Sequence, residues 1–143
     1  MKKIYFFAVL SLFSTFTYAK CKVPDSLEGL TFQNMIDPHY SSINPNAGAI
    51  ERITYHTDTY KARFINDRTI GPFKGLYTYR VLDEDNGVGL YQGYESKPFN
   101  KPSHTVVFKC LTNNYGLAIF TQQSGENEEK SRQNSIFYTI TRR

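Results

Sequence analysis

The fold class is decided by residues 75–95, which read GLYTYRVLDEDNGVGLYQGYE. Tyr77, Tyr79 and Val81 alternate with residues of the other face, which is the period of a β-strand. Asn86-Gly87 then gives the strongest hairpin signal in the chain, because both residues tolerate the positive φ that a tight primed turn requires. A second alternating run follows this turn directly. We therefore predict an antiparallel hairpin at the centre of the chain.

The same rhythm of short strands and turns recurs along the rest of the sequence, and no helical periodicity is sustained. This all-β pattern suits an up-and-down barrel or a two-sheet β-sandwich. We expect the eight-stranded antiparallel barrel, because closure removes exposed strand edges, and we keep the β-sandwich as the alternative. The expected strands are Leu30–Met35, Ile50–His56, Tyr60–Ile65, Gly75–Leu82, Val88–Glu95, Thr105–Leu111, Tyr115–Gln122 and Ser135–Thr141.

Residues 1–19 have the pattern of a cleavable signal peptide. Lys2-Lys3 form a basic start, Ile4–Phe16 is an uncharged run too short to span a bilayer comfortably, and Thr17-Tyr18-Ala19 ends in a small-x-small cleavage pattern. We expect export to the periplasm or the cell exterior, with no stable membrane anchor after cleavage. Residues 20–143 then form a single domain, and its net charge is below the +4 of the whole chain.

The two cysteines, Cys21 and Cys110, both follow the predicted cleavage site. An even number of cysteines in an oxidising compartment indicates one disulfide. Closing so long a loop would contribute roughly 4 kcal/mol in the chain-entropy model. Two free thiols or a metal pair are the alternatives, although no Cys-His cluster at ligand spacing supports a metal.

Two segments resemble those of known barrels. Leu27-Glu28-Gly29-Leu30-Thr31-Phe32 resembles the opening of calycin and lipocalin-like proteins, in which such a segment starts the first strand and plugs the barrel base. Residues 71–79, GPFKGLYTY, resemble the glycine-then-aromatic strand of the same folds. The likeness includes the small barrels related to the MoaF family. It implies a cavity that holds a small apolar or amphiphilic ligand.

Strand alternation suggests which side chains would line such a cavity. Aromatic residues that combine apolar surface with polar tips are frequent in this sequence, with eleven Tyr and eleven Phe. The alternative is that these side chains fill the interior completely, because an eight-stranded barrel is only just wide enough to hold them. The candidate ligand-binding residues are Tyr60, Phe64, Tyr77, Tyr79, Phe108 and Tyr138.

The sequence does not point to an enzyme, a cofactor or a metal. His39, His56 and His104 have no partner at a spacing typical of catalysis, so each is interpreted as a surface or hydrogen-bonding residue. The acidic turn 83–87 lacks the distal Glu of a calcium loop and fits a hairpin better. Scattered basic residues favour solvated charge over a nucleic-acid partner.

Two long connections, Ile36–Ala49 and Ser124–Asn134, support a second functional hypothesis. Loops of this length often carry function. The alternative to a ligand-binding barrel is therefore an exported protein-interaction domain, such as an inhibitor or an immunity protein, that contacts a protein partner through these loops.

Overall fold

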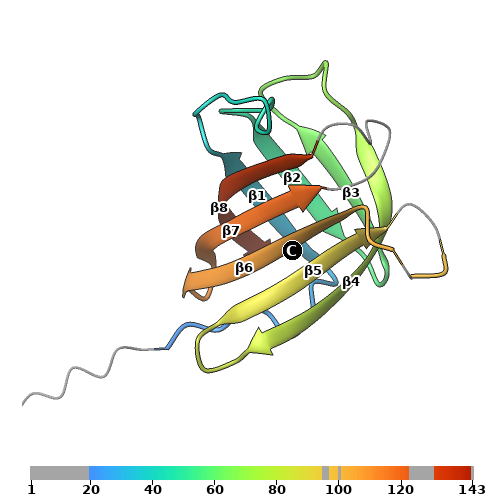
Figure 1. Ribbon diagram of the computed structural model, residues 1–143. Coiled ribbons are helices and arrows are strands. Elements are labelled where there is room, and N and C mark those ends of the chain that lie inside the picture. Colours follow the sequence, from blue (N-terminus) through green and yellow to red (C-terminus); the bar gives the residue numbers. More distant parts are fainter. Residues whose placement is uncertain (1–19, 95–96, 100, 123–130, 143) are drawn as a thin grey trace, which may run out of the picture.

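Consecutive strands pair in antiparallel fashion and close into a barrel (Figure 1). The structure is a computed structural model that describes residues 20–94, 97–99, 101–122 and 131–142. The described residues contain no helix, and so none that could cross a membrane. The strands are β1 (Leu30–Ile36), β2 (Ile50–Tyr55), β3 (Thr59–Phe64), β4 (Phe73–Asp83), β5 (Val88–Tyr94), β6 (His104–Thr112), β7 (Tyr115–Gln122) and β8 (Arg132–Arg142).

The predicted eight-stranded barrel is confirmed, and the β-sandwich alternative is wrong because β8 pairs with β1 and leaves one closed sheet. All eight expected strands are present. β4 and β8 begin two and three residues earlier than predicted. The predicted signal peptide lies outside the described residues. The predicted loop 124–134 does so as well, apart from residue 131 and the start of β8.

The central hairpin forms, but its turn differs from the prediction. Gly87 has a φ of 61°, whereas no non-glycine residue in the described chain has a positive φ, so Asn86 does not adopt the conformation of a primed turn. Asp83 instead accepts hydrogen bonds from the Asn86 backbone N–H (2.9 Å) and side-chain amide (2.7 Å). The longer acidic turn thus closes through an aspartate cap, with glycine needed at one position only.

The N-terminal segment 20–29 closes the base of the barrel. Cys21 forms the predicted disulfide with Cys110 of β6, with 5.9 Å between the two Cα atoms. Leu27 is 1% exposed and lies under the interior. The Tyr79 hydroxyl donates a hydrogen bond to the Pro24 carbonyl (2.8 Å). The end at which β1, β3, β5 and β7 finish is here called the mouth. The two ends are not fully separate, because Lys97 of the β5–β6 connection forms an ion pair with Asp58 of the β2–β3 turn (3.1 Å).

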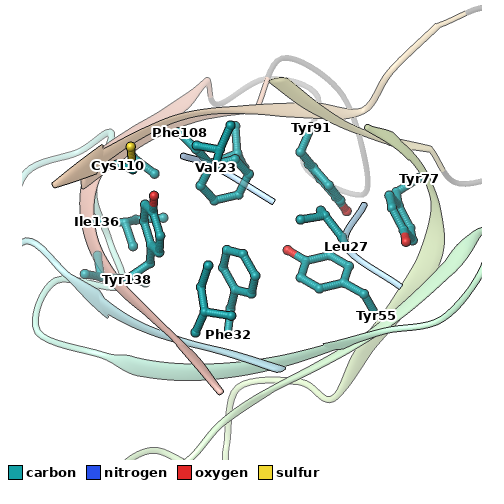
Figure 2. Close-up of a cluster of buried hydrophobic side chains, with 14 of the residues drawn as sticks. Val23, Leu27, Phe32, Tyr55, Tyr77, Tyr91, Phe108, Cys110, Ile136 and Tyr138 are labelled. Atoms are coloured by element: carbon teal, nitrogen blue, oxygen red, sulfur yellow. The ribbon is translucent and has the colours of Figure 1, made fainter. Parts of the chain in front are cut away.

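Aromatic side chains fill the lower and middle interior. Phe32 and Tyr138 are each 1% exposed, and their rings stack with centroids 5.4 Å apart. Tyr77 stacks on Tyr91 at 5.6 Å, and Tyr55 meets both of these rings edge-on. Figure 2 shows these rings arranged around the barrel interior, with Val23 and Leu27 among them. The six candidate ligand-binding residues belong to the core cluster or pack against it, so most of their surface contacts other side chains.

Inward-facing glycines make room for the aromatic rings. Gly75, Gly93 and Gly116 pair directly across the sheet with Tyr60, His104 and Tyr138, respectively. A Cβ atom at any of the three glycines would collide with its partner's ring. Each ring therefore lies over the backbone of the neighbouring strand, which is possible because glycine has no side chain.

The pair formed by Gly93 and His104 can be tested with a double-mutant cycle. Gly93→Ala places a methyl group against the His104 ring, so we expect it to lower the free energy of unfolding by roughly 2 kcal/mol. In Gly93→Ala/His104→Ala the ring is absent and the methyl group fits. We expect a favourable coupling of about 1–2 kcal/mol in urea unfolding experiments.

Gly116→Ala is the matched control for this cycle. Its Cβ would collide with the Lys109 carbonyl as well as with Tyr138. Truncating Tyr138 should therefore leave most of the loss in place, because the backbone clash remains. Additive losses in the Gly93 cycle would show that the ring does not occupy the space above the glycine.

Removing the disulfide should loosen the base. Cys21→Ala/Cys110→Ala releases a link between residues 89 apart in sequence, and we expect a loss of roughly 4 kcal/mol. Urea unfolding of this variant, and of the unaltered chain with and without reductant, measures the loss. The variant itself should not respond to reductant. If reductant lowered the free energy of unfolding equally in the unaltered chain and in the variant, the Cys21–Cys110 disulfide would be contradicted.

Candidate functional site

Polar side chains enter the barrel interior at the mouth. Asn34 lies two residues before the mouth end of β1, Glu51 is the second residue of β2, and His104 is the first residue of β6. All three share the inward face of their strands, because they alternate in phase with buried apolar residues such as Phe32, Tyr55 and Phe108. We call Asn34, Glu51, Tyr60, Tyr91, His104 and Phe120 the mouth site.

Glu51 is the most unusual member of the mouth site. Burial raises the pKa of its carboxyl to about 7, and a hydrogen bond from Asn34 opposes this only in part. The Asn34 side-chain amide donates to Glu51 Oε2 at 3.1 Å. Among the described residues, no cation forms an ion pair with this carboxyl. A buried acid without a compensating cation is costly for a fold and is typical of functional sites.

The other polar atom of the Asn34 side chain, its amide oxygen, has no hydrogen-bond partner among the described residues. This atom, Oδ1, is buried. The residue is 4% exposed, so bulk water does not readily satisfy this oxygen. Asn34 Oδ1 and the Glu51 carboxylate are thus two hydrogen-bond acceptors on the inner faces of β1 and β2.

His104 supplies a neutral aromatic wall. Its ring nitrogens lie 2.9 Å from Ser103 Oγ and 3.2 Å from the Tyr91 hydroxyl. Burial lowers the pKa of His104 to about 4, so the ring is uncharged at neutral pH. Burial likewise raises the pKa of the Tyr91 hydroxyl well above its ordinary value. None of the six side chains of the mouth site is therefore cationic under physiological conditions.

Three aromatic rings surround His104. Its ring centroid lies 5.4 Å from Tyr91, 5.5 Å from Phe120 and 5.9 Å from Tyr60. Glu51, Tyr60, His104 and Phe120 face inward yet remain partly exposed, in contrast to the sealed rings below them. The upper barrel is therefore less completely buried than the core below it. Open clefts of about 280 Å³ beside the mouth and about 190 Å³ at the base lie outside the interior.

The structure divides the candidate residues between two regions. Tyr60 belongs to the mouth site, and Phe64 lies at the mouth rim with its ring against Phe73 (6.2 Å). The other four candidates lie in the packed core below: Tyr77, Tyr79, Phe108 and Tyr138. The sequence interpretation missed Asn34, Glu51, Tyr91 and Phe120. It assigned His104 only a surface or hydrogen-bonding role.

A sequence signal for the missed residues does exist. Asn34 is in phase with Phe32 and Ile36, and Glu51 is in phase with Ile53 and Tyr55. A polar residue in the apolar phase of a strand marks a buried polar group. Of the three histidines, His39 and His56 are exposed, and only His104 faces inward.

The described residues contain no group of three or more His, Cys, Asp or Glu side chains placed to hold a metal ion. Comparisons with protein-family models, with curated proteins and with solved structures found no match.

The burial of Glu51 predicts a pH-dependent stability. Its pKa is about 7 in the folded chain against an ordinary 4.5. Between these values the folded state binds more protons than the unfolded state, so the free energy of unfolding falls as the pH rises. The fall is roughly 3 kcal/mol, and Glu51→Gln should abolish it. Urea unfolding at about pH 5 and about pH 8 measures the difference.

His104→Gln is the control, because its effect has the opposite sign. The pKa of His104 is lowered, so this residue contributes stability that is lost as the pH falls from 6.5 towards about 4. His104→Gln should reduce that acid-side loss and keep the fall caused by Glu51. A Glu51→Gln variant with an unchanged fall would contradict the assignment of the buried acid.

Proposed function

We propose that this chain is an exported binding protein that holds a small amphiphilic amine in the mouth site. The observation that carries the proposal is the inward-facing Glu51 carboxyl, which is largely desolvated and has no cationic partner among the described residues. A protonated amine would supply the missing positive charge. It would also donate a hydrogen bond to Asn34 Oδ1, the unpartnered acceptor beside Glu51.

The aromatic members of the mouth site support the same ligand class. The faces of Tyr and Phe rings carry negative electrostatic potential and attract organic cations. Tyr60, Tyr91 and Phe120 surround His104 at ring distances of 5.4–5.9 Å. An anionic ligand such as a fatty acid would instead meet the Glu51 carboxylate with no cation in the mouth site to balance it. Charge therefore favours amines over acids.

The packed core limits the length of the ligand. Phe32 and Tyr138 are almost completely buried below the mouth, and Leu27 closes the base. A long acyl chain would have to displace this core. The proposed ligand is therefore a compact aromatic or short alkyl amine that occupies the upper barrel only.

Export is part of the proposal. It rests on the signal-peptide pattern of residues 1–19 and is supported by the Cys21–Cys110 disulfide, since disulfides persist mainly in oxidising compartments. The resemblance to calycin barrels points to the same kind of ligand-holding role.

A protein-interaction function is the second candidate, favoured by the loop between β1 and β2. Asn44 is buried within this loop and donates hydrogen bonds to the carbonyls of Asp37 (3.0 Å) and His39 (2.8 Å). The loop therefore has a fixed shape of its own, and it presents Tyr40 with 77% of its surface exposed. Exposed tyrosines on ordered loops are frequent anchors of protein interfaces.

Calorimetric titration with tryptamine at about pH 8 tests the amine proposal, with the anionic analogue indole-3-propionate as comparison. We expect saturable tryptamine binding. Glu51→Gln should weaken it by about 10- to 100-fold, because a charge-assisted hydrogen bond is lost. Binding should strengthen from about pH 6 to pH 8 as Glu51 ionises while the amine stays protonated.

Glu84→Gln is the matched control, since Glu84 lies exposed on the basal β4–β5 turn, where it pairs with Lys22. It should bind tryptamine like the unaltered chain. Absence of saturable binding by both tryptamine and octylamine would overturn the proposal. Equal affinity for indole-3-propionate, or full binding by Glu51→Gln, would do the same.

A further inference from the structure

The outer surface of β6, β7, β8 and β1 carries a continuous apolar patch. Leu117 pairs with Phe137, Phe137 pairs with Met35, and Val107 pairs with Ile119, so the side chains are direct cross-strand neighbours. Large exposed patches of this kind are rare on monomeric proteins and mark interaction sites. The exposed fractions are Val107 41%, Leu117 39%, Ile119 52%, Phe137 41% and Met35 52%.

This patch is free of charge at its centre. The outward residues of β7, β8 and β1 are all uncharged, with Tyr, Leu, Ile, Phe, Met, Thr, Ser and Gln side chains. Tyr115 stacks on Phe137 and extends the apolar surface (centroids 6.5 Å apart). Lys109 of β6 lies directly across from Leu117 and is the charged neighbour of the patch on this side. Its Nζ donates a hydrogen bond to the Asn86 carbonyl at the base. We call this surface the uncharged face.

Another part of the barrel surface has the opposite character. Arg52 of β2 lies directly across from Arg63 of β3, and Lys61 lies directly across from Lys74 of β4. All four side chains are exposed, and none forms an ion pair with another described residue. Like charges directly opposite each other are destabilising. Two copies of this basic face would repel each other strongly.

We propose that the chain forms a symmetric dimer through the uncharged face. In a two-fold interface the same surface is present on both subunits, so every charge near the axis meets its own copy. The centre of the uncharged face has no charge that would repel its own copy, whereas the basic face of β2–β4 would place like charges against each other. A closed barrel also has no free strand edge, so two copies cannot associate by edge-to-edge strand pairing. The proposal is independent of the amine-binding function.

The cleft beside the mouth extends the proposed interface. It has a volume of about 280 Å³, and Ile119 of the uncharged face forms part of its wall together with Tyr40 of the β1–β2 loop. Ile43 of the same loop is 45% exposed, and its carbonyl accepts a hydrogen bond from the Gln133 backbone N–H (2.9 Å). The loop is thus held against the start of β8. It offers a fixed recess beside the flat apolar patch.

Sedimentation velocity of the folded chain, from about 1 to 200 µM, tests the dimer. We expect a concentration-dependent monomer–dimer equilibrium. Ile119→Lys and Phe137→Lys should each raise the dissociation constant about 100-fold or more, because each substitution places two unpaired lysines in the interface. Both residues are well exposed in the monomer, so circular dichroism and thermal unfolding should be nearly unchanged.

Leu82→Lys is the matched control. Leu82 is 47% exposed and lies on β4, outside the uncharged face, so its substitution should leave the equilibrium intact. A monomer at every concentration would overturn the proposal and leave the face to a different protein. A dimer that resists Ile119→Lys and Phe137→Lys, or that Leu82→Lys disrupts, would also overturn it.

Discussion

The pairing of inward glycines with aromatic rings determines how the interior of this barrel is filled. Rings that lie over Gly75, Gly93 and Gly116 fold flat against neighbouring strands instead of meeting at the barrel axis. The interior thereby accepts far more aromatic surface than ordinary cross-strand pairs would allow. Each pair also fixes the local register, since a slip of one residue would turn the ring outward and leave a void above the glycine.

This filling divides the barrel interior into two regions of different character. Below, the stacked rings, Leu27 and the disulfide give a sealed core that supplies most of the apolar burial. Above, the desolvated Glu51 carboxyl and the unpartnered Asn34 amide oxygen cost stability. No ion pair among the described residues compensates the carboxyl. A fold can tolerate such a cost only where the rest of the core is well packed. The well-packed base therefore offsets the cost of the polar groups at the mouth.

The strands follow from local sequence, because alternation and turn residues act over a few positions. Closure does not, because it depends on the pairing of β1 with the distant β8, and local patterns left the β-sandwich as an alternative. Even so, the prediction of a primed turn at Asn86-Gly87 was wrong. The Asp83 side chain caps this turn through hydrogen bonds that a rule based on two residues does not include. The mouth site and the two outer faces depend on register, which joins residues far apart in sequence. Arg52 and Arg63 look scattered along the chain and become neighbours only once β2 pairs with β3.

Strand β1 links the two proposed sites. Asn34 faces the interior beside Glu51, and the next residue, Met35, lies on the uncharged face against Phe137. Consecutive strand residues point to opposite faces, so one backbone segment positions both side chains. The two proposed sites therefore share one strand, although each is argued from observations of its own: the Glu51 carboxyl on the inside and the apolar cross-strand pairs on the outside.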